Sequence, residues 1–248
     1  MRLEGKVAIV TGAAKGFGRA FCLRLAQEGA KVVAADIVDA SGTVAEIEAK
    51  GGVGLALKVD VTSAEDTLRM AEETVEKFGR IDILISNAAA LYGIKIVPFY
   101  EIEIEEWDRL MAVNVKGQWL CARAVFPQMK KQGKGKIINM GSTSFISAAG
   151  PFAHYVTSKA AIIGLTRALA RELGDHNINV NTLAPGFTLT EAGHLLRAQG
   201  VGSRAVGRCF KRDEQPEDVL GAMVFLCSED SDFMTGQTVV VDGGGSFL

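Results

Sequence analysis

Tyr155 and Lys159 are the pair of side chains in this sequence best placed for acid–base chemistry. Residues four positions apart share one face of an α-helix, so a helix through this segment brings the phenol and the ammonium together. Free tyrosine has a pKa of about 10, too high for a base near neutral pH. A neighbouring positive charge favours the phenolate and lowers that pKa. The spacing therefore predicts that Tyr155 passes a proton to or from a substrate oxygen as a general acid or base.

Ser142 is the third residue of this group. It follows an apolar run at 136–140 that is typical of a buried strand. A hydroxyl after that strand donates a hydrogen bond to a carbonyl oxygen or to a developing alkoxide, which is oxyanion stabilisation on a small scale. A Tyr–Lys pair by itself is common on helices, and its place downstream of this serine makes it informative. We expect the three side chains to act on one C–O group.

The segment 11–18, TGAAKGFG, has the features of an anion-binding turn. It lies between an apolar run at 7–10 and an apolar-periodic stretch at 17–29, so it connects a predicted strand to a predicted helix. Glycines allow a tight turn, and the free N–H groups of a helix N-terminus attract a diphosphate. The spacing is Gly-x-x-x-Gly-x-Gly, which does not strictly match the general Gly-x-Gly-x-x-Gly fingerprint of dinucleotide sites. The predicted cofactor contacts here are Gly12, Lys15, Gly16, Phe17 and Gly18.

Asp36 ends the second predicted strand, close to the position of an acid that binds the adenosine ribose of a dinucleotide. Its carboxylate repels a 2′-phosphate and so favours NAD over NADP. Lys15 has the opposite tendency, because a cation in the glycine turn can pair with that phosphate. We expect Asp36 to dominate, since it occupies the ribose position directly, and we predict NAD as the cofactor. The positive nicotinamide then adds to the effect of Lys159 on the pKa of Tyr155.

Apolar strand-like runs alternate with helix-periodic segments along the whole chain. This alternation is typical of a parallel sheet with helices on both faces. Ligands bind beyond the carboxyl ends of such strands, where Asp60-Val61 and Asn87-Ala88 are also predicted to contact the cofactor, Asp60 towards the adenine. The predicted strands are 7–10, 32–35, 55–59, 83–85, 136–140, 178–183 and 238–241, and the predicted helices are 17–29, 43–50, 64–78, 105–132, 155–174 and 217–228.

No Pro/Gly/Ser-rich linker and no repeat divides the chain. We therefore predict one domain, residues 1–248, with a Rossmann-type α/β fold and a doubly wound parallel sheet. Residues 1–90 form its mainly dinucleotide-binding half. The stretch 188–215 is the least regular and follows the carboxyl end of a strand, so it is the predicted substrate lid.

Composition and charge narrow the class of protein. The 27 basic and 29 acidic side chains leave a net charge of −2, which argues against a nucleic-acid or membrane partner. The start of the chain lacks the apolar region of a signal peptide, so we expect a cytoplasmic protein. The cysteines and histidines lack ligand spacing, and no metal is predicted. A local basic cluster is interpreted as a solvated face, with an anion-binding lip over the substrate site as the alternative; it comprises Arg204, Arg208, Lys211 and Arg212.

Together these motifs resemble the classical short-chain dehydrogenases/reductases along essentially the whole chain. The resemblance implies that Asn114 completes a tetrad with the Ser-Tyr-Lys group by holding a helix kink and a water that relays protons to Lys159. It also implies that Lys159 binds the nicotinamide ribose, that the sheet has seven strands and that the protein is a homotetramer. Pro185, Gly186 and Thr188 are implied to meet the carboxamide end of the cofactor. The further matching segments are Asn114-Val115-Lys116-Gly117, Thr235-Gly236-Gln237 and Asp242-Gly243-Gly244.

Three positions depart from the family pattern, namely Phe17, Ala89 and Gly141, and none belongs to the Ser-Tyr-Lys group. Carried over by the same resemblance, the substrate pocket is apolar with few polar anchors. His154 is expected at the rim of this pocket or in solvent, because adjacent helix residues point in different directions. The predicted pocket residues are Ser142, Ser144, Phe145, Phe152, Tyr155, Phe187 and Leu195.

The sequence thus predicts an NAD-dependent oxidoreductase that moves a hydride between nicotinamide and a small cyclic, aromatic or aliphatic secondary alcohol or its ketone. One alternative is an enzyme similar to 3-oxoacyl-[acyl-carrier-protein] reductases; Asp36 disfavours their usual NADPH, and the basic cluster suits the carrier's phosphopantetheine arm. A sugar 1-dehydrogenase is another alternative. A non-catalytic NAD-sensing protein is a third, but it would be expected to lack Tyr155 or Lys159, and both are present.

Overall fold

The computed structural model describes residues 1–148, 150–201 and 203–247. Its centre is a seven-stranded sheet of order β3-β2-β1-β4-β5-β6-β7, in which all neighbouring strands run parallel. The order reverses between β1 and β4, and doubly wound sheets bind ligands at such a switch point. The strands are β1 Val7–Thr11, β2 Lys31–Asp36, β3 Gly54–Lys58, β4 Ile83–Ser86, β5 Gly135–Met140, β6 Ile178–Pro185 and β7 Thr238–Val241.

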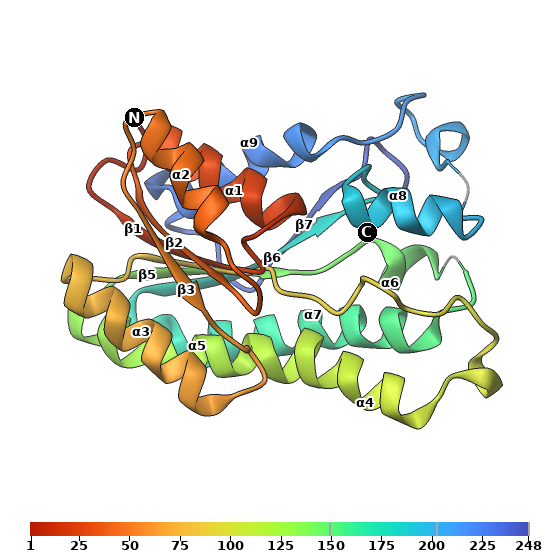
Figure 1. Cartoon of the computed structure of the whole chain (residues 1–248), viewed down its shortest axis with the longest axis horizontal. Helices are drawn as coiled ribbons and strands as arrows, with labels where there is room; N and C mark the ends of the chain where they lie inside the picture. The colour runs from red at the N-terminus through yellow and green to blue at the C-terminus, as the bar shows by residue number, and fades with distance from the viewer. Residues whose placement is uncertain (149, 202, 248) are drawn as a thin grey trace.

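Helices cover both faces of the sheet (Figure 1). One face carries α1, α2 and α9, and the other carries α3, α5 and α7, while α4, α6 and α8 extend past the carboxyl ends of the strands. The predicted single-domain Rossmann-type fold with a doubly wound parallel sheet is therefore confirmed. The helices are α1 Gly16–Gln27, α2 Ser41–Ala49, α3 Ala64–Phe78, α4 Ile104–Met111, α5 Gly117–Gln132, α6 Ser144–Ser147, α7 Ala153–Leu173, α8 Glu191–Ala198 and α9 Pro216–Cys227.

Alternate residues of the central strands pack against the two helical layers. In β1, Ala8 and Val10 belong to the core cluster that includes Phe21 of α1, whereas Ile9 belongs to the opposite cluster with Val125 of α5. Successive side chains of a strand point to opposite faces, so a strand covered on both sides needs apolar residues at every position. This requirement explains the unbroken apolar runs in the sequence.

The predicted long helix 105–132 is interrupted by a π-helical turn, Ala112–Lys116, between α4 and α5. Asn114 lies in this turn and is fully buried. Its Oδ1 accepts a hydrogen bond from the Ala90 N–H at 2.8 Å, and its Nδ2 donates to Ser158 Oγ at 3.0 Å. A π turn inserts one residue into the helical repeat, and these two bonds tie the widened turn to its neighbours.

The stretch 188–215 is more regular than predicted, because it contains α8. Thr190 caps this helix by accepting a hydrogen bond from the Gly193 N–H at 3.2 Å, and Glu191 stands in its first turn. A threonine cap followed by an acidic residue is a helix-start pattern that the sequence already contained. Within the described residues, no helix is long and apolar enough to cross a membrane.

Candidate active site

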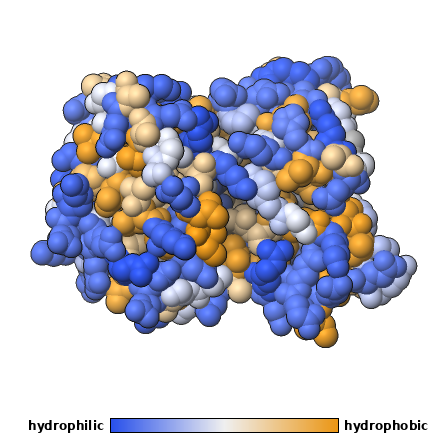
Figure 2. All heavy atoms as spheres, viewed as in Figure 1, coloured by the Kyte–Doolittle hydropathy of each residue, from blue (hydrophilic) through white to orange (hydrophobic). Residues whose placement is uncertain are grey.

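A cleft of about 890 Å³ lies beyond the carboxyl ends of the strands, and segments far apart in the sequence meet in it. The space-filling view is hollowed in the middle of this face, between the side of α1 and α2 and the side of α8 (Figure 2). Most of the predicted site residues line the cleft. These are Gly12, Lys15, Gly16, Phe17, Asp36, Asp60, Val61, Asn87, Ala88, Ser142, Ser144, Phe152, Tyr155, Lys159, Pro185, Gly186, Phe187 and Thr188.

The glycine turn needs glycine for two different reasons. Gly12 has φ 66°, and a Cβ there would lie 2.8 Å from Ala88 Cα. Gly18 has ordinary φ, but a Cβ there would lie 1.9 Å from the carbonyl oxygen of Gly12, so this residue lets the helix start pack against the turn. Gly16, with φ 56°, opens α1 at the cleft. The turn thus leaves the N-terminus of α1 accessible from the cleft.

Asp36 connects the end of β2 to this turn. Its Oδ2 accepts a hydrogen bond from the Ala14 N–H at 2.9 Å, and its Oδ1 accepts one from the Val38 N–H at 3.1 Å. Lys15 instead extends over the ring of Tyr92, with Nζ 3.6 Å from the ring centroid. The carboxylate therefore occupies the strand end, while the lysine has an aromatic partner.

Asn87 and Thr11 hold the two switch-point strands together. Asn87 Nδ2 donates to the carbonyl oxygens of Thr11 and Gly12 at 2.9 and 3.0 Å. In return, Thr11 Oγ1 accepts hydrogen bonds from the N–H groups of Asn87 and Ala88 at 3.0 and 3.1 Å. Sequence reasoning included Thr11 in the segment 11–18 but assigned it no role, although it is a polar residue that ends an apolar strand just before the glycine turn.

Lys159 and Tyr155 lie one turn apart on α7, as their spacing predicted. Lys159 Nζ donates a hydrogen bond to the Met140 carbonyl at 2.8 Å, and burial lowers the pKa of this lysine to about 8. Burial raises the pKa of Tyr155 to about 12, against the smaller lowering effect of a hydrogen bond with Ser142. The protein's own groups therefore do not lower the pKa of Tyr155 as expected, because the loss of hydration has a larger effect than these groups have.

Asn114 does not line the cleft with the other three members of the implied tetrad. It acts one layer behind them, because its partner Ser158 in turn donates to the Tyr155 carbonyl at 2.8 Å. The implied kink corresponds to the π turn at 112–116. The side chain of Asn114 thus fixes the first turns of α7 relative to α5.

Two predicted pocket residues, Phe145 and Leu195, lie outside the cleft lining, whereas Leu196 lines it. Leu195 is exposed, on the outer side of α8. Successive helix residues point in different directions, so the register of α8 decides which leucine faces inwards. This register could not be predicted from the sequence, because α8 itself was not predicted.

His154 is buried, and the expected position at the rim or in solvent was wrong. Its Nε2 lies 3.1 Å from Glu106 Oε1 of α4, and Nδ1 has no hydrogen-bond partner among the described residues. The pair joins the start of α7 to α4. The two residues are 48 positions apart, so no local sequence pattern predicted this contact.

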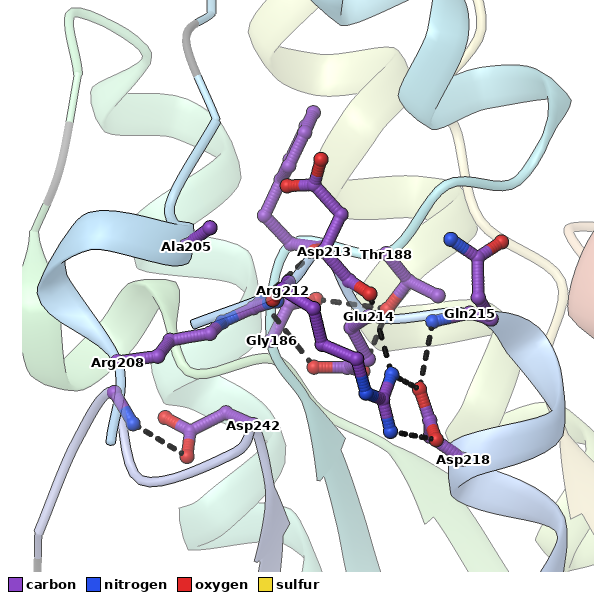
Figure 3. A network of polar contacts seen from close by, with 12 residues as sticks. Gly186, Thr188, Ala205, Arg208, Arg212, Asp213, Glu214, Gln215, Asp218 and Asp242 are labelled. Atoms are coloured by element: carbon purple, nitrogen blue, oxygen red, sulfur yellow. Dashed lines mark hydrogen bonds and ion pairs between the residues drawn. The ribbon is translucent and has the colours of Figure 1, made fainter. Parts of the chain in front are cut away.

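The structure divides the basic cluster at 204–212. Arg212 pairs with Asp218 at the surface (Figure 3), and Lys211 donates to the carbonyls of Val206 and Arg208. Arg208 is buried beside Glu214. Only Arg204 and Arg208 of this cluster line the cleft, where Arg109 of α4 joins them; Arg109 was not predicted. A solvated face therefore describes Lys211 and Arg212 but not Arg208.

Comparison with known proteins identifies the family of this fold and site. A family model described as enoyl-(acyl carrier protein) reductase matches residues 12–246. The 3-oxoacyl-[acyl-carrier-protein] reductase FabG of Thermotoga maritima is 38% identical over 250 residues, covering 98% of this chain and 99% of the relative. The 2-dehydro-3-deoxy-D-gluconate 5-dehydrogenase of Dickeya dadantii is 36% identical over 245 residues, covering 98% and 96%. Dehydrogenase/reductase SDR family member 4 of Bos taurus is 38% identical over 250 residues, covering 98% and 88%.

A comparison with a solved structure supports the same family assignment. The crystal structure of a candidate NAD(P)-dependent gluconate 5-dehydrogenase from Beutenbergia cavernae, with NADP bound at low occupancy, superimposes with a TM-score of 0.91. It is 34% identical in sequence, and the match covers 98% of this chain and 97% of that one. Fold and site define an oxidoreductase that acts on CH–OH groups with a nicotinamide cofactor. The chain belongs to the short-chain dehydrogenase/reductase family.

Proposed function

We propose that this enzyme uses NAD(H) to interconvert a secondary alcohol and its ketone, with Tyr155 as the general acid and base. The observation that carries the proposal is that Ser142, Tyr155 and Lys159 line the same cleft as the glycine turn and Asp36. A site for proton transfer and a site for a dinucleotide are thus continuous. Asn114 is the positioning residue of this group, through Ser158 and the Tyr155 carbonyl.

The protonation of Tyr155 favours its use as an acid. With a pKa raised to about 12 by burial, the phenol keeps its proton at neutral pH. In ketone reduction, the Ser142 hydroxyl donates a hydrogen bond to the carbonyl oxygen while Tyr155 delivers a proton to it. The bound cofactor supplies the hydride. Alcohol oxidation uses the same residues in reverse and requires the phenol to lose its proton, which positive charge in the cleft favours.

The described residues fit a dinucleotide. A Cβ on Gly16 would project towards Glu191 Oε2 at 3.5 Å and Tyr92 Oη at 3.9 Å, so glycine keeps the cleft open at the start of α1. Free N–H groups there suit a diphosphate. Besides the turn, the proposed cofactor contacts are Asp36, Asp60, Val61, Asn87, Ala88, Tyr155, Lys159, Pro185, Gly186 and Thr188, all of which line the cleft.

Asp36 supports NAD over NADP. The carboxylate stands at the end of β2, whereas the Lys15 ammonium lies on Tyr92. Moving Lys15 to a 2′-phosphate would forfeit that contact, which is worth about 0.5–1 kcal/mol at an exposed site. The Beutenbergia cavernae structure contains NADP. Our proposal for this chain differs, because Asp36 disfavours the 2′-phosphate of NADP.

A second candidate is an enzyme for anionic or carrier-bound substrates. Arg109 and Arg204 line the cleft from α4 and from the lid, and both are exposed. No carboxylate pairs with either of them in the part of the chain that the structure describes. Two relatives are named for a carrier-bound acyl chain and for a sugar acid. These arginines would suit either substrate; of the alternatives predicted from the sequence, the 3-oxoacyl-[acyl-carrier-protein] reductase is the one for which basic residues were expected.

Binding and turnover assays separate these candidates. NADH and NADPH are titrated by nicotinamide fluorescence, followed by turnover of neutral cyclic and aromatic ketones, a 3-oxoacyl thioester and sugar acids. Preference for NADH with turnover of neutral ketones supports the main proposal. Turnover restricted to acidic substrates, reduced by Arg204→Gln and Arg109→Gln, supports the second candidate. Preference for NADPH with turnover of the 3-oxoacyl thioester supports the carrier-bound form of the second candidate and contradicts the main proposal.

We also propose that residues 188–215 close over the substrate and that the enzyme is a homotetramer. The lid contributes Thr190, Leu196 and Arg204 to the cleft lining. Trp107 of α4 and Trp119 of α5 are exposed by 36% and 42%, and such aromatic surface suits a subunit contact. Light scattering on the purified protein at micromolar concentration tests the tetramer; a monomer would contradict it.

A further inference from the structure

A buried acidic group lies directly behind one end of the cleft. Glu214 immediately precedes the cap of α9, and its side chain is only 3% exposed. Its Oε1 accepts a hydrogen bond from Thr188 Oγ1 at 2.7 Å, and its Oε2 lies 3.3 Å from Arg208 Nη2 (Figure 3). Thr188 and Arg208 line the cleft, so Glu214 forms the layer beneath them.

Glu214 also fastens the two ends of the lid to each other. Its carbonyl oxygen accepts the Leu189 N–H at 2.9 Å, in a parallel bridge between Thr188 and Glu214. Arg208 adds a bond from Nη2 to the Phe187 carbonyl at 2.8 Å. Main chain and side chain of Glu214 therefore fix the position of Thr188 from one side.

The direction of the hydrogen bond from Thr188 is the important feature. Its hydroxyl has one proton and two acceptor lone pairs. Two acceptors are in reach: Glu214 Oε1 at 2.7 Å and the Gly186 carbonyl at 3.1 Å. The shorter bond to a carboxylate is the stronger one. With the proton directed to Glu214, the lone pairs of Thr188 stay available on the cleft side.

We propose that Glu214 is a positioning residue for the nicotinamide: its carboxylate holds the Thr188 proton and so presents the Thr188 oxygen as an acceptor for the carboxamide NH₂ group. The inference rests on the proposed function, in which Pro185, Gly186 and Thr188 meet the carboxamide. It adds a group that does not itself contact the cofactor. The close packing of Gly186 against this pair is consistent with it, because a Cβ there would lie 2.6 Å from Glu214 Oε2.

In the part of the chain that the structure describes, three charged side chains lie near this carboxylate, and one of them, Arg212, is paired with Asp218. Arg208 approaches from the lid, and Asp242 lies after β7, where its Oδ1 accepts the N–H groups of Gly244 and Gly245. Burial above all raises the pKa of Glu214 to about 7; Thr188 and Arg208 oppose this rise and the negative charge of Asp242 adds to it. Protonated Glu214 becomes a donor and turns the Thr188 hydroxyl towards Gly186. The positioning effect is therefore complete above pH 7 and is lost as the pH falls through that value.

Glu214→Gln reverses the hydrogen bond without changing the size of the side chain. Arg208 requires an acceptor, so the amide oxygen faces Arg208 and the amide NH₂ group donates to Thr188. We expect the Kd for NADH to rise about fivefold, the size of one ordinary hydrogen bond. Asp213→Asn is the matched control, because among the described residues this neighbouring carboxylate bonds to Arg197 and Ser203 and not to Thr188.

A double-mutant cycle distinguishes positioning from a structural role. If Glu214 acts through Thr188, Glu214→Gln has no further effect on the NADH Kd in a Thr188→Val background. An equal loss in both backgrounds, or no loss in either, overturns the inference. Wild-type protein that fails to bind NADH refutes the proposed function instead.

The wild-type pH profile supplies a test that does not need the Glu214 variant to fold. We expect the NADH Kd to rise as the pH is lowered from 8 to 6, through the pKa of about 7 of Glu214. The same titration of Thr188→Val should show a smaller dependence, because the contribution of Glu214 is lost while that of Lys159, with a pKa of about 8, remains. A wild-type Kd that is independent of pH, or an unchanged slope in Thr188→Val, contradicts the inference.

Discussion

Asp36→Asn is the substitution that tests cofactor choice most directly. It removes one negative charge from the end of β2 and preserves the shape of the side chain. The carboxylate accepts the N–H groups of Ala14 and Val38. The asparagine keeps one of these bonds and loses the other. That loss affects NADH and NADPH alike, so it cancels in the ratio of their affinities.

The expected size of the effect follows from the charge alone. Two unit charges 4 Å apart repel by about 4 kcal/mol at an effective dielectric constant of 20, and by about 1 kcal/mol in water. Asp36 is partly exposed at the cleft, so a value of about 1.5–2 kcal/mol between these limits is appropriate. This corresponds to a shift of about 10- to 30-fold in the NADH to NADPH preference.

Fluorescence titration with both cofactors measures the ratio, at low and high salt. Asp39→Asn is the control, because Asp39 is exposed, lies three residues further on and bonds to Ser41. We expect this variant to keep the wild-type ratio. A ratio for Asp36→Asn within about twofold of wild type would refute the electrostatic reasoning, since it would mean that the 2′-position lies outside the range of this charge.

Three further predictions concern the catalytic group and the packing beneath it. Tyr155→Phe should lower kcat at least about 100-fold, the size of a general acid–base contribution, while the NADH Kd from fluorescence titration stays near wild type; retained turnover would exclude Tyr155 as the proton donor. The kcat/KM for ketone reduction should fall as the pH rises through about 8, because Lys159 has a lowered pKa and loses its charge there; a profile flat to pH 9 would contradict this. Gly186→Ala should destabilise the fold by about 1–3 kcal/mol through overpacking. Gly221→Ala is the control and should not destabilise it, because a Cβ there would meet nothing within 4 Å. Equal melting temperatures of the two variants would show that Glu214 and Arg208 move apart freely.

The residues that could be predicted from the sequence are those whose role is written in local spacing. The four-residue spacing of Tyr155 and Lys159 placed them on one helical face before any fold was known. The glycine turn was recognisable because it stands between an apolar strand and a periodic helix. The unbroken apolar run at 7–10, in β1, indicated a sheet covered on both faces.

The positions that sequence reasoning missed depend on contacts between distant segments. Leu196 faces the cleft and Leu195 does not, because the register of α8 depends on the cap at Thr190. His154 is buried because Glu106 of α4 meets it. From the sequence, Arg208 was interpreted as one of four solvated cations, because its contact with Glu214 exists only in the folded chain.

Glu214 is the clearest example of a residue whose role depends on contacts between distant segments. In the sequence it is one of two adjacent acidic residues before a helix, where such residues are commonly solvated. Glu214 is buried because its segment returns to Thr188 and because β7 brings Asp242 to the same place. Periodicity and motif spacing by themselves predicted the parallel sheet, the glycine turn and the Ser-Tyr-Lys group, since these are properties of short segments. Only the tertiary structure decided which charges are buried, what they pair with and which way the Thr188 hydroxyl points, because these depend on loop closure and desolvation.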